Sequence, residues 1–391
     1  MTTSRRAGAS NAESNLVSAR AQRIRYHVDL RFTPLLTTEM GIPRKGSWPC
    51  GRSRHQGSAR QERSQQQGRQ RRVPPVFQGA IGWTAVNLAS DHLGTIKVGA
   101  LCVLYNNVEL PQLLRDLSAS SGVFVSILDN SGDLAESVPV GVEVVRPGRN
   151  LGYSAGVNRA LAALPSDIDV LLVINPDIVS DVGGLLALAH RVVNMEGPAL
   201  VAPTSEDEMF GFQPRQSVAT TIIAYSLRTE NLFGDRTNGF LSGALLALNA
   251  AALDVLVSDG RLLQENLFFM DDVELSARAR RLGVGVREVH CAGSIRHIGG
   301  VSMRRRPSVR IYFSRVSKVR YWSQTRPLQA RLLAAFFVLE SSVGWLVATH
   351  HARHVLVREG ATEAEGFKAV VQWLVSRDDS IDQIILGNVV R

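Results

Sequence analysis

The sequence predicts an α/β protein with a mostly parallel sheet, followed by a helical C-terminal region. Short apolar runs alternate with helical patterns between residues 96 and 303, and such runs suit strands that are buried on both faces of a parallel sheet. From Pro307 onward the pattern is helical, with many arginines and aromatic residues. The apolar fraction of 45% in 391 residues is enough for a hydrophobic core.

Three regions follow from composition. Residues 1–95 are predicted to be a disordered basic extension, because residues 1–75 are rich in Arg, Gln, Ser and Gly and could bury little apolar surface. An RNA- or lipid-binding arm is one alternative, and a mis-assigned start is another. Residues 96–303 form the predicted α/β domain, and residues 304–391 form the helical region.

The elements of the α/β domain can be placed in order. Glycine and proline clusters separate them, and Gly283 closes the last helix as a C-terminal cap. The predicted strands are 96–105, 123–128, 142–145, 169–174, 199–202, 240–248 (interrupted at Ser242-Gly243) and 286–289. The predicted helices are 110–117, 155–164, 182–193 and 273–282.

Charge and cysteine content limit the function classes. The net charge is +9, but residues 1–95 hold 15 of the 44 basic and 5 of the 35 acidic residues, so the remainder has 29 and 30. Nucleic acid is therefore not an expected partner of the folded part. Cys50, Cys102 and Cys291 are too few for a disulfide framework. These features, and the lack of an N-terminal apolar stretch, predict a cytoplasmic protein.

Polar residues follow the predicted strands at the edge where parallel α/β sheets bind ligands. Asp129 ends one strand, and Asn175-Pro176-Asp177 ends another. The glycine-rich turn 149–158 leads into a helix, whose N-terminus offers free N–H groups to a phosphate or ribose. Asp129 can accept hydrogen bonds from a base or ribose, and Asp177 offers a hard oxygen to Mg²⁺ or Mn²⁺.

Two further segments carry candidate chemistry. Asp271 and Asp272 follow an apolar patch and open a helix, so they serve either as a favourable charge at the helix N-terminus or as a general base. Arg278 either holds a carboxylate or phosphate or faces solvent. His297 is either structural or completes the metal site as a neutral imidazole.

Taken together, the motifs resemble the family 2 glycosyltransferases, in particular their rhamnosyltransferase-like branch. Seven pieces match in order over about 200 residues: Val103 to Asn106, Asp129 to Ser131, Arg149 to Asn158, Asn175 to Asp177, Leu241 to Ala244, Phe269 to Arg278, and His297 to Ser302. The resemblance implies a GT-A fold for residues 96–303, a nucleotide-diphospho-sugar donor, a divalent cation (Mg²⁺ or Mn²⁺) and inversion at the anomeric carbon.

The resemblance also implies roles for single residues. Asp272 would be the base, with Asp271 beside it, and Asp177 and His297 would bind the metal. Ser242 and Gly243 would lie on the acceptor side. The donor would be bound by Tyr105, Asn106, Asp129, Asn150, Gly152, Gly156, Asn158, Asn175 and Arg278. Two departures are Asn175, where many relatives have Asp, and Asp271, where they have Glu; one carboxylate fewer predicts weaker metal binding.

The implied function is transfer of L-rhamnose from dTDP-rhamnose to a cell-envelope glycan or a polyprenyl-diphosphate-linked precursor. The alternatives are the same fold with another UDP- or dTDP-sugar, a non-catalytic nucleotide-sugar sensor, and a nucleic-acid-binding protein led by residues 1–75.

Basic and aromatic residues alternate between Arg304 and Trp322. This pattern predicts a surface for an anionic membrane, which would place the protein on the inner face of the plasma membrane. Residues 332–349 are apolar, but Glu340 disfavours a membrane span, so an interfacial helix or an ordinary packed helix is expected there. The alternative for this region is a helical subdomain that covers the sheet or forms a homo-oligomer.

Overall fold

A computed structural model describes residues 96–134, 138–204, 211–227, 235–290, 295–298, 306–355 and 358–387. The predicted extension 1–95 lies outside these residues. All the described residues belong to one compact unit.

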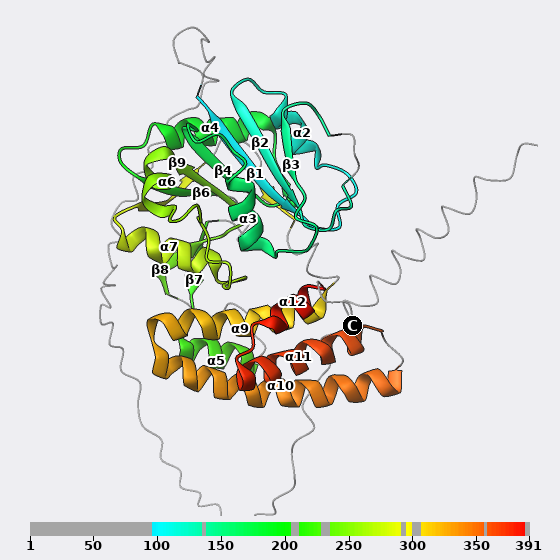
Figure 1. The fold of residues 1–391 in the computed structure, drawn as a ribbon. Helices are drawn as coiled ribbons and strands as arrows, with labels where there is room; N and C mark the ends of the chain where they lie inside the picture. Colours follow the sequence, from blue (N-terminus) through cyan, green and yellow to red (C-terminus); the bar gives the residue numbers. More distant parts are fainter. Residues whose placement is uncertain are drawn as a thin grey trace, which may run out of the picture. The chain divides into compact units, whose positions relative to one another are not determined.

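The core of the protein is a seven-stranded sheet in the order β10-β6-β9-β4-β1-β2-β3 (Figure 1). Strand β9 runs antiparallel to its neighbours β4 and β6, and the other pairs are parallel. The predicted fold class, α/β with a mostly parallel sheet and C-terminal helices, is confirmed. The strands are β1 (Val98–Leu104), β2 (Val123–Asp129), β3 (Val142–Val145), β4 (Val170–Ile174), β6 (Ala199–Thr204), β9 (Leu245–Asn249) and β10 (Gly285–His290).

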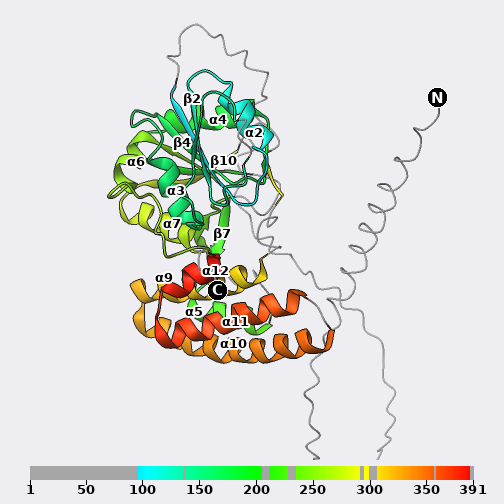
Figure 2. The same cartoon turned by 45° about the vertical axis from the view of Figure 1, so that its right-hand side comes forward.

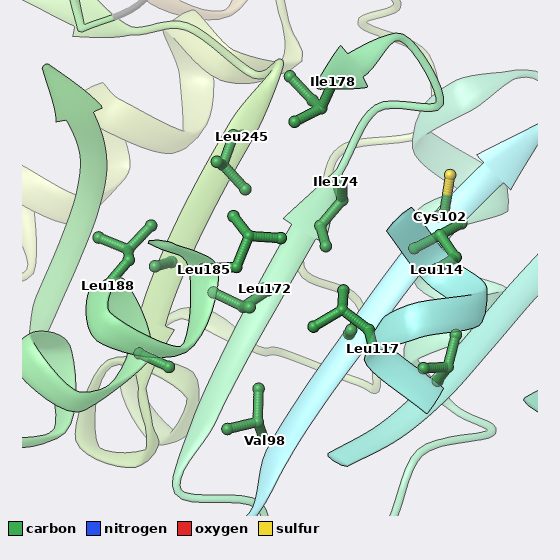
Figure 3. Packing of buried hydrophobic residues seen from close by; sticks show 14 of the residues in the cluster. Val98, Cys102, Leu114, Leu117, Leu172, Ile174, Ile178, Leu185, Leu188 and Leu245 are labelled. Carbon is green, nitrogen blue, oxygen red and sulfur yellow. The ribbon is translucent and has the colours of Figure 1, made fainter. Parts of the chain in front are cut away.

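Helices cover both faces of this sheet. On one face, α2 (Gln112–Ser118) and α4 (Val182–Val193) pack their leucines against β1 and β4 (Figure 3). On the other face lie α3 (Tyr153–Leu161), α6 (Ala250–Leu256) and α7 (Asp271–Arg281). Every residue of β1, β4 and β9 is buried, as expected for central strands with helices on both sides.

The predicted strand 240–248 is interrupted at Ser242-Gly243, as expected, and its two halves belong to different sheets. The chain turns at Ser242-Gly243, and this turn separates β8 (Asp235–Leu241) from β9. Strand β8 pairs with β7 (Phe212–Arg215) in a separate two-stranded sheet. A third sheet joins β5 (Ile178–Val179) to β11 (Arg296–His297). These short strands and α5 (Val218–Leu227) have no clear periodicity in the sequence.

The C-terminal region is a helical layer built around one apolar cluster (Figure 2). Its helices are α9 (Pro307–Thr325), α10 (Pro327–Val355), α11 (Arg358–Ser376) and α12 (Ser380–Leu386). Helix α5 and the start of α7 add residues to the same cluster, so the predicted boundary at residue 304 does not separate the packing of the two regions.

The predicted basic and aromatic membrane surface does not form over residues 312–322; Arg304 and Arg305 lie outside the described residues. Tyr312, Phe313, Tyr321 and Trp322 are all buried, with exposed fractions of 4% or less. The arginines between them are buried as well: Arg315 pairs with Glu340 of α10 through two hydrogen bonds of 2.6 and 2.8 Å. The alternation of cations and rings in α9 reflects stacking inside the helical layer.

Candidate active site

The ends of β1, β2 and β4 bring the predicted residues to one edge of the sheet. Leu104 and Asp129 are register partners at the ends of β1 and β2. The next turn is tied down where the Asn106 N–H donates to Ser131 Oγ at 2.9 Å. Asn106 has a φ of 57°, a left-handed conformation that asparagine adopts more readily than most residues.

The carboxylate of Asp129 accepts hydrogen bonds from backbone N–H groups of the loop that follows β2. One carboxylate oxygen accepts from the N–H of Gly132 at 2.8 Å, and the other accepts from the N–H of Leu134 at 3.1 Å. The side chain is fully buried, and Arg146 Nε lies 3.6 Å away. Its observed role is therefore to shape the loop after β2, and the contact with a nucleoside stays a prediction.

Asn130 was not among the predicted site residues, although it joins the end of β2 to the glycine-rich turn. Its amide nitrogen donates to the Gly152 carbonyl at 3.0 Å, and its oxygen accepts from the Leu151 N–H at 2.9 Å. Asn150 Oδ1 accepts from the Gly152 N–H at 2.9 Å. Gly152 has a φ of 79° at the N-terminus of α3, a conformation that favours glycine. The glycine-rich turn is therefore held rigidly against the end of β2.

Three predicted donor contacts have packing roles instead. A Cβ on Gly156 would lie 2.8 Å from Leu128, so this glycine allows α3 to approach the sheet closely. Asn158 uses both ends of its amide on residues 262–265. Arg278 pairs with Glu274 at 3.0 Å and donates to the carbonyls of Leu256 and Leu262. The structure therefore gives no support to a donor contact by these residues.

Asp177 and His297 lie together, as predicted. His297 Nε2 and Asp177 Oδ1 are 3.0 Å apart, with side-chain exposures of 11% and 15%. The antiparallel pairing of β5 and β11 places His297 opposite Ile178, and the Ile298 N–H donates to the Asp177 carbonyl at 3.1 Å. Residues 120 positions apart thus meet because two short strands pair.

These donors fit a cation that takes its remaining ligands from a diphosphate and water. Among the described residues, no group of three or more His, Cys, Asp or Glu side chains could hold a metal ion. Mg²⁺ commonly uses one or two protein carboxylates and substrate phosphates. Asn175 Oδ1 is buried and has no hydrogen-bond partner in the described part of the chain, so one more oxygen remains available two residues before Asp177.

The acidic pair at the start of α7 faces the turn between β8 and β9. The Gly243 N–H donates to Asp272 Oδ2 at 3.2 Å, and a Cβ on Gly243 would lie 3.4 Å from Asp272. Asp271 is buried and accepts from Ser154 Oγ of α3 at 3.3 Å. Gly243 and Asp272 were predicted to share the acceptor side, and the structure brings them together. Ser242 lies beside them, where its N–H donates to the Gly211 carbonyl.

Burial raises the pKa of both carboxyls. The pKa of Asp271 rises to about 7 because the group is buried and because Asp272 is close. The pKa of Asp272 rises to about 6 through burial, while the N–H groups of Gly243 and Val273 and the charge of Lys318 oppose that rise. A carboxylate whose pKa lies near neutrality is suited to general-base work.

Tyr153, at the N-terminus of α3, contacts the same turn as Asp272. Its hydroxyl donates to the Gly243 carbonyl at 3.2 Å. Burial raises the pKa of Tyr153, and the charges of Asp271, Asp272 and Asp177 raise it further. Gly243 therefore contacts both Tyr153 and Asp272, and the neighbouring Ala244 carbonyl accepts from the Asn175 N–H at 2.9 Å.

Phe269 marks strain immediately before the acidic pair. Its φ is 71°, which is unusual for a bulky aromatic residue and is held only when surrounding contacts enforce it. The ring centroids of Phe268 and Phe269 are 4.6 Å apart, and the ring centroid of Phe268 lies 5.1 Å from that of Phe313 of α9. The helical layer therefore helps to fix the conformation from which α7 begins.

The helical region also supplies groups that sequence reasoning missed. The guanidinium of Arg306 lies 4.9 Å from the ring centroid of Tyr105 and donates to the carbonyls of Ile385 and Leu386. Asn150 Nδ2 donates to the same Leu386 carbonyl at 3.2 Å. The end of α12 is thereby tied to the glycine-rich turn, through contacts that are too distant in sequence to be predicted from spacing.

The shifted pKa of Asp271 predicts a pH-dependent stability. Folded Asp271 keeps a proton that the unfolded chain releases above about pH 4, so the free energy of unfolding should fall as pH rises from about 4 to about 7. In Asp271→Asn this loss should shrink by on the order of 1 kcal/mol or more. Urea unfolding at pH 5 and pH 8 measures the difference; parallel losses in both proteins would contradict the assignment.

Comparison with known proteins gives weak structural similarities. No protein-family model matches the chain, and no curated protein matches it either. A mannosyltransferase from Pyrobaculum calidifontis in complex with GDP-mannose and Mn²⁺ is similar at a TM-score of 0.38 and 12% identity, over 72% of this chain and 88% of that one.

Two other solved structures are similar over about half of this chain. A 4-diphosphocytidyl-2C-methyl-D-erythritol synthase from Anaerococcus prevotii has a TM-score of 0.32 and 11% identity, over 53% of this chain and 92% of that one. The catalytic domain of Drosophila β1,4-galactosyltransferase 7 with xylobiose has a TM-score of 0.29 and 12% identity, over 52% and 72%. At these scores, the roles of the site residues rest on this chain's own geometry.

Proposed function

We propose that this chain is an inverting glycosyltransferase that uses a nucleotide-diphospho-sugar donor. The observation that supports it most is that the segment carrying Asp177 lies beside the turn that holds Asp272. The Asn175 N–H donates to the Ala244 carbonyl at 2.9 Å, and the adjacent Gly243 N–H donates to Asp272.

Asp177 and His297 can hold a cation that neutralises the charge of a diphosphate. Asp271 and Asp272 include a carboxylate that can remove a proton from a hydroxyl. Both requirements belong to transfer of a sugar from a nucleoside diphosphate to an alcohol.

Asp272 is the proposed base. It is the more exposed member of the acidic pair, and the Gly243 N–H holds Oδ2 in place. Asp272 would accept the proton of the acceptor hydroxyl as its oxygen attacks the anomeric carbon from the face opposite the diphosphate. Asp271 is buried and accepts a hydrogen bond from Ser154 Oγ, so it acts as a positioning residue at the start of α7.

Asp177 and His297 would hold the divalent cation (Mg²⁺ or Mn²⁺), with Asn175 supplying an amide oxygen. When bound, the cation neutralises charge on the leaving diphosphate. Asn130 and Asn150 keep the glycine-rich turn closed against β2, which leaves the N-terminus of α3 aimed at the same region. A helix N-terminus favours an anion.

The finer assignment follows the sequence resemblance. We propose L-rhamnose from dTDP-rhamnose as the donated sugar, and a cell-envelope glycan or a polyprenyl-diphosphate-linked glycan as the acceptor. The protein would then act in the cytoplasm or on the inner face of the plasma membrane. Other UDP- or dTDP-sugars are the alternative donors.

A donor panel tests the proposal. The full chain is incubated with dTDP-rhamnose, UDP-galactofuranose, UDP-N-acetylglucosamine or GDP-mannose, and release of nucleoside diphosphate is measured with Mn²⁺, with Mg²⁺ or with a chelator. Release from one donor that requires a cation is the expected result. Binding of a donor without turnover, in the presence of candidate acceptors, would instead indicate a nucleotide-sugar sensor.

Asp177→Asn is expected to raise the Mn²⁺ concentration needed for half-maximal release by at least about tenfold, because a charged ligand is replaced by a neutral one. Asp181→Asn, which alters an exposed helix cap of α4, is the control and should leave that concentration unchanged. An unchanged Mn²⁺ requirement in Asp177→Asn would contradict the assignment of this residue.

A further inference from the structure

Helix α10 has an exposed apolar stripe along its length. Leu328, Leu332, Leu339, Val343 and Leu346 have exposed fractions between 54% and 72%. Their spacings of four, seven, four and three residues place them on one face of the helix. Trp345 and Val347, also exposed, flank this stripe. We refer to these seven residues as the α10 stripe.

This helix is apolar enough to cross a membrane, by length and composition. The window within Pro327–His350 has a mean hydropathy of 1.8, and only 28% of it is buried. However, the opposite face of α10 packs against α9 and α11, with Leu333 and Phe337 fully buried. A helix with one packed and one apolar exposed face suits a position in the plane of a membrane interface rather than across the bilayer.

The charges of α10 are arranged to match an anionic surface. Its single acidic residue, Glu340, points inward to a bidentate pair with Arg315 of α9. Arg326 and Arg331 are exposed at the N-terminal end of the stripe. The sequence beyond the stripe continues with His350-His351-Ala352-Arg353-His354. Two exposed arginines therefore lie beside the apolar stripe, and the one carboxylate of the helix is turned away from it.

We propose that the α10 stripe docks the protein onto an anionic lipid surface, with the helix parallel to the membrane plane. The leucines would enter the boundary between headgroups and acyl chains, and the flanking cations would contact lipid phosphates. Trp345 suits this depth because its ring combines an apolar body with one polar N–H. The surface is separate from the acidic pair and from Asp177, so the docking does not depend on the proposed reaction.

Vesicle sedimentation of the full chain tests the docking. Wild type is expected to sediment with vesicles of mixed phosphatidylglycerol and phosphatidylcholine, and much less with phosphatidylcholine alone. The variant Leu332→Gln/Leu339→Gln/Leu346→Gln should lower the partition coefficient at least about tenfold. Val140→Gln/Val255→Gln/Leu282→Gln changes three exposed apolar side chains outside the C-terminal helices, and it should bind like wild type.

The α10 variant must be compared with wild type in the full chain, because the basic residues 1–95 could bind anionic vesicles by themselves. If the α10 variant sediments as strongly as wild type, the proposal is overturned. If wild type is a dimer in solution, fails to bind vesicles, and becomes a monomer in the α10 variant, the stripe is a contact between copies and the proposal is also overturned. Unchanged circular dichroism and thermal unfolding are expected, because the three leucines are exposed.

Fluorescence gives a second readout at the stripe itself. Anionic vesicles should shift the tryptophan emission of wild type to shorter wavelength, and most of that shift should be lost in Trp345→Phe while sedimentation is kept. Trp322 and Trp373 are buried and should not respond. Trp48 and Trp83 of residues 1–95 are present in both proteins, so the difference between wild type and Trp345→Phe reports Trp345. A vesicle-induced shift of the same size in Trp345→Phe would place the lipid contact elsewhere.

Discussion

Asp272→Asn is expected to lower the rate of sugar transfer by about 10³-fold, with little change in donor affinity. The substitution keeps an oxygen that can accept from the Gly243 N–H, so the turn between β8 and β9 should stay in place. What is lost is the capacity to take a proton from the acceptor hydroxyl. Transfer measured with saturating donor and acceptor isolates this step.

Asp254→Asn is the matched control. It makes the same chemical change on the exposed face of α6 and should leave the rate within about twofold of wild type. Equal rates for Asp272→Asn and wild type would remove Asp272 from the mechanism. Equal loss of donor binding and transfer would make it a structural residue.

The pH profile gives an independent signature of the same group. A base with a pKa of about 6 is active when ionised, so transfer by wild type should rise as pH increases through about 6 and level off above it. The residual transfer by Asp272→Asn should lack this rise. A general loss of stability could not produce that difference in the shape of the curve.

The main strands and their polar ends could be predicted from the sequence because each signal is local. A short, fully apolar run such as 170–174, rich in valine and isoleucine, favours a central strand. The residue that follows a parallel strand lies at the ligand-binding edge of the sheet. The pairing of Asp177 with His297 could also be anticipated, through the resemblance of the motifs.

The remaining site features depend on tertiary contacts. Nothing in the spacing of Arg278 shows that it holds the carbonyls of Leu256 and Leu262. The amide of Asn130 acts across a gap of about 20 residues. The arginines of α9 suggested a charged surface, because composition does not reveal that acidic residues of α10 and α12 neutralise them inside the helical layer.

Arg320 is the clearest example of such neutralisation. It is 7% exposed and donates to Asp382 at 2.9 and 3.1 Å, to Asp379, and to the Asn266 carbonyl at 3.3 Å. Tyr312 donates to Asp382 at 2.6 Å. One guanidinium therefore joins α9 to α12 and also to the segment that leads into the acidic pair.

Arg320→Met is expected to lower the free energy of unfolding by about 3 kcal/mol. Methionine can fill much of the volume, but Asp382 would be left in a mostly buried site beside the Tyr312 hydroxyl, with no cation. Asp379 moderates the loss because its side chain is 74% exposed and can be hydrated. Urea unfolding at neutral pH measures the change.

Arg326→Met is the control for the loss of an arginine that has no buried carboxylate partner among the residues that the structure describes. Arg326 is exposed, and its guanidinium lies 5.8 Å from the ring centroid of Trp322. This substitution should lower the free energy of unfolding by less than about 0.5 kcal/mol. Because Arg320 also holds the Asn266 carbonyl, five residues before Asp271, its loss should lower transfer even at temperatures where the variant remains folded. Full transfer by folded Arg320→Met would show that the helical layer stabilises the protein without positioning Asp271 and Asp272. A loss in both measurements would show that the C-terminal helices hold these two carboxylates in place.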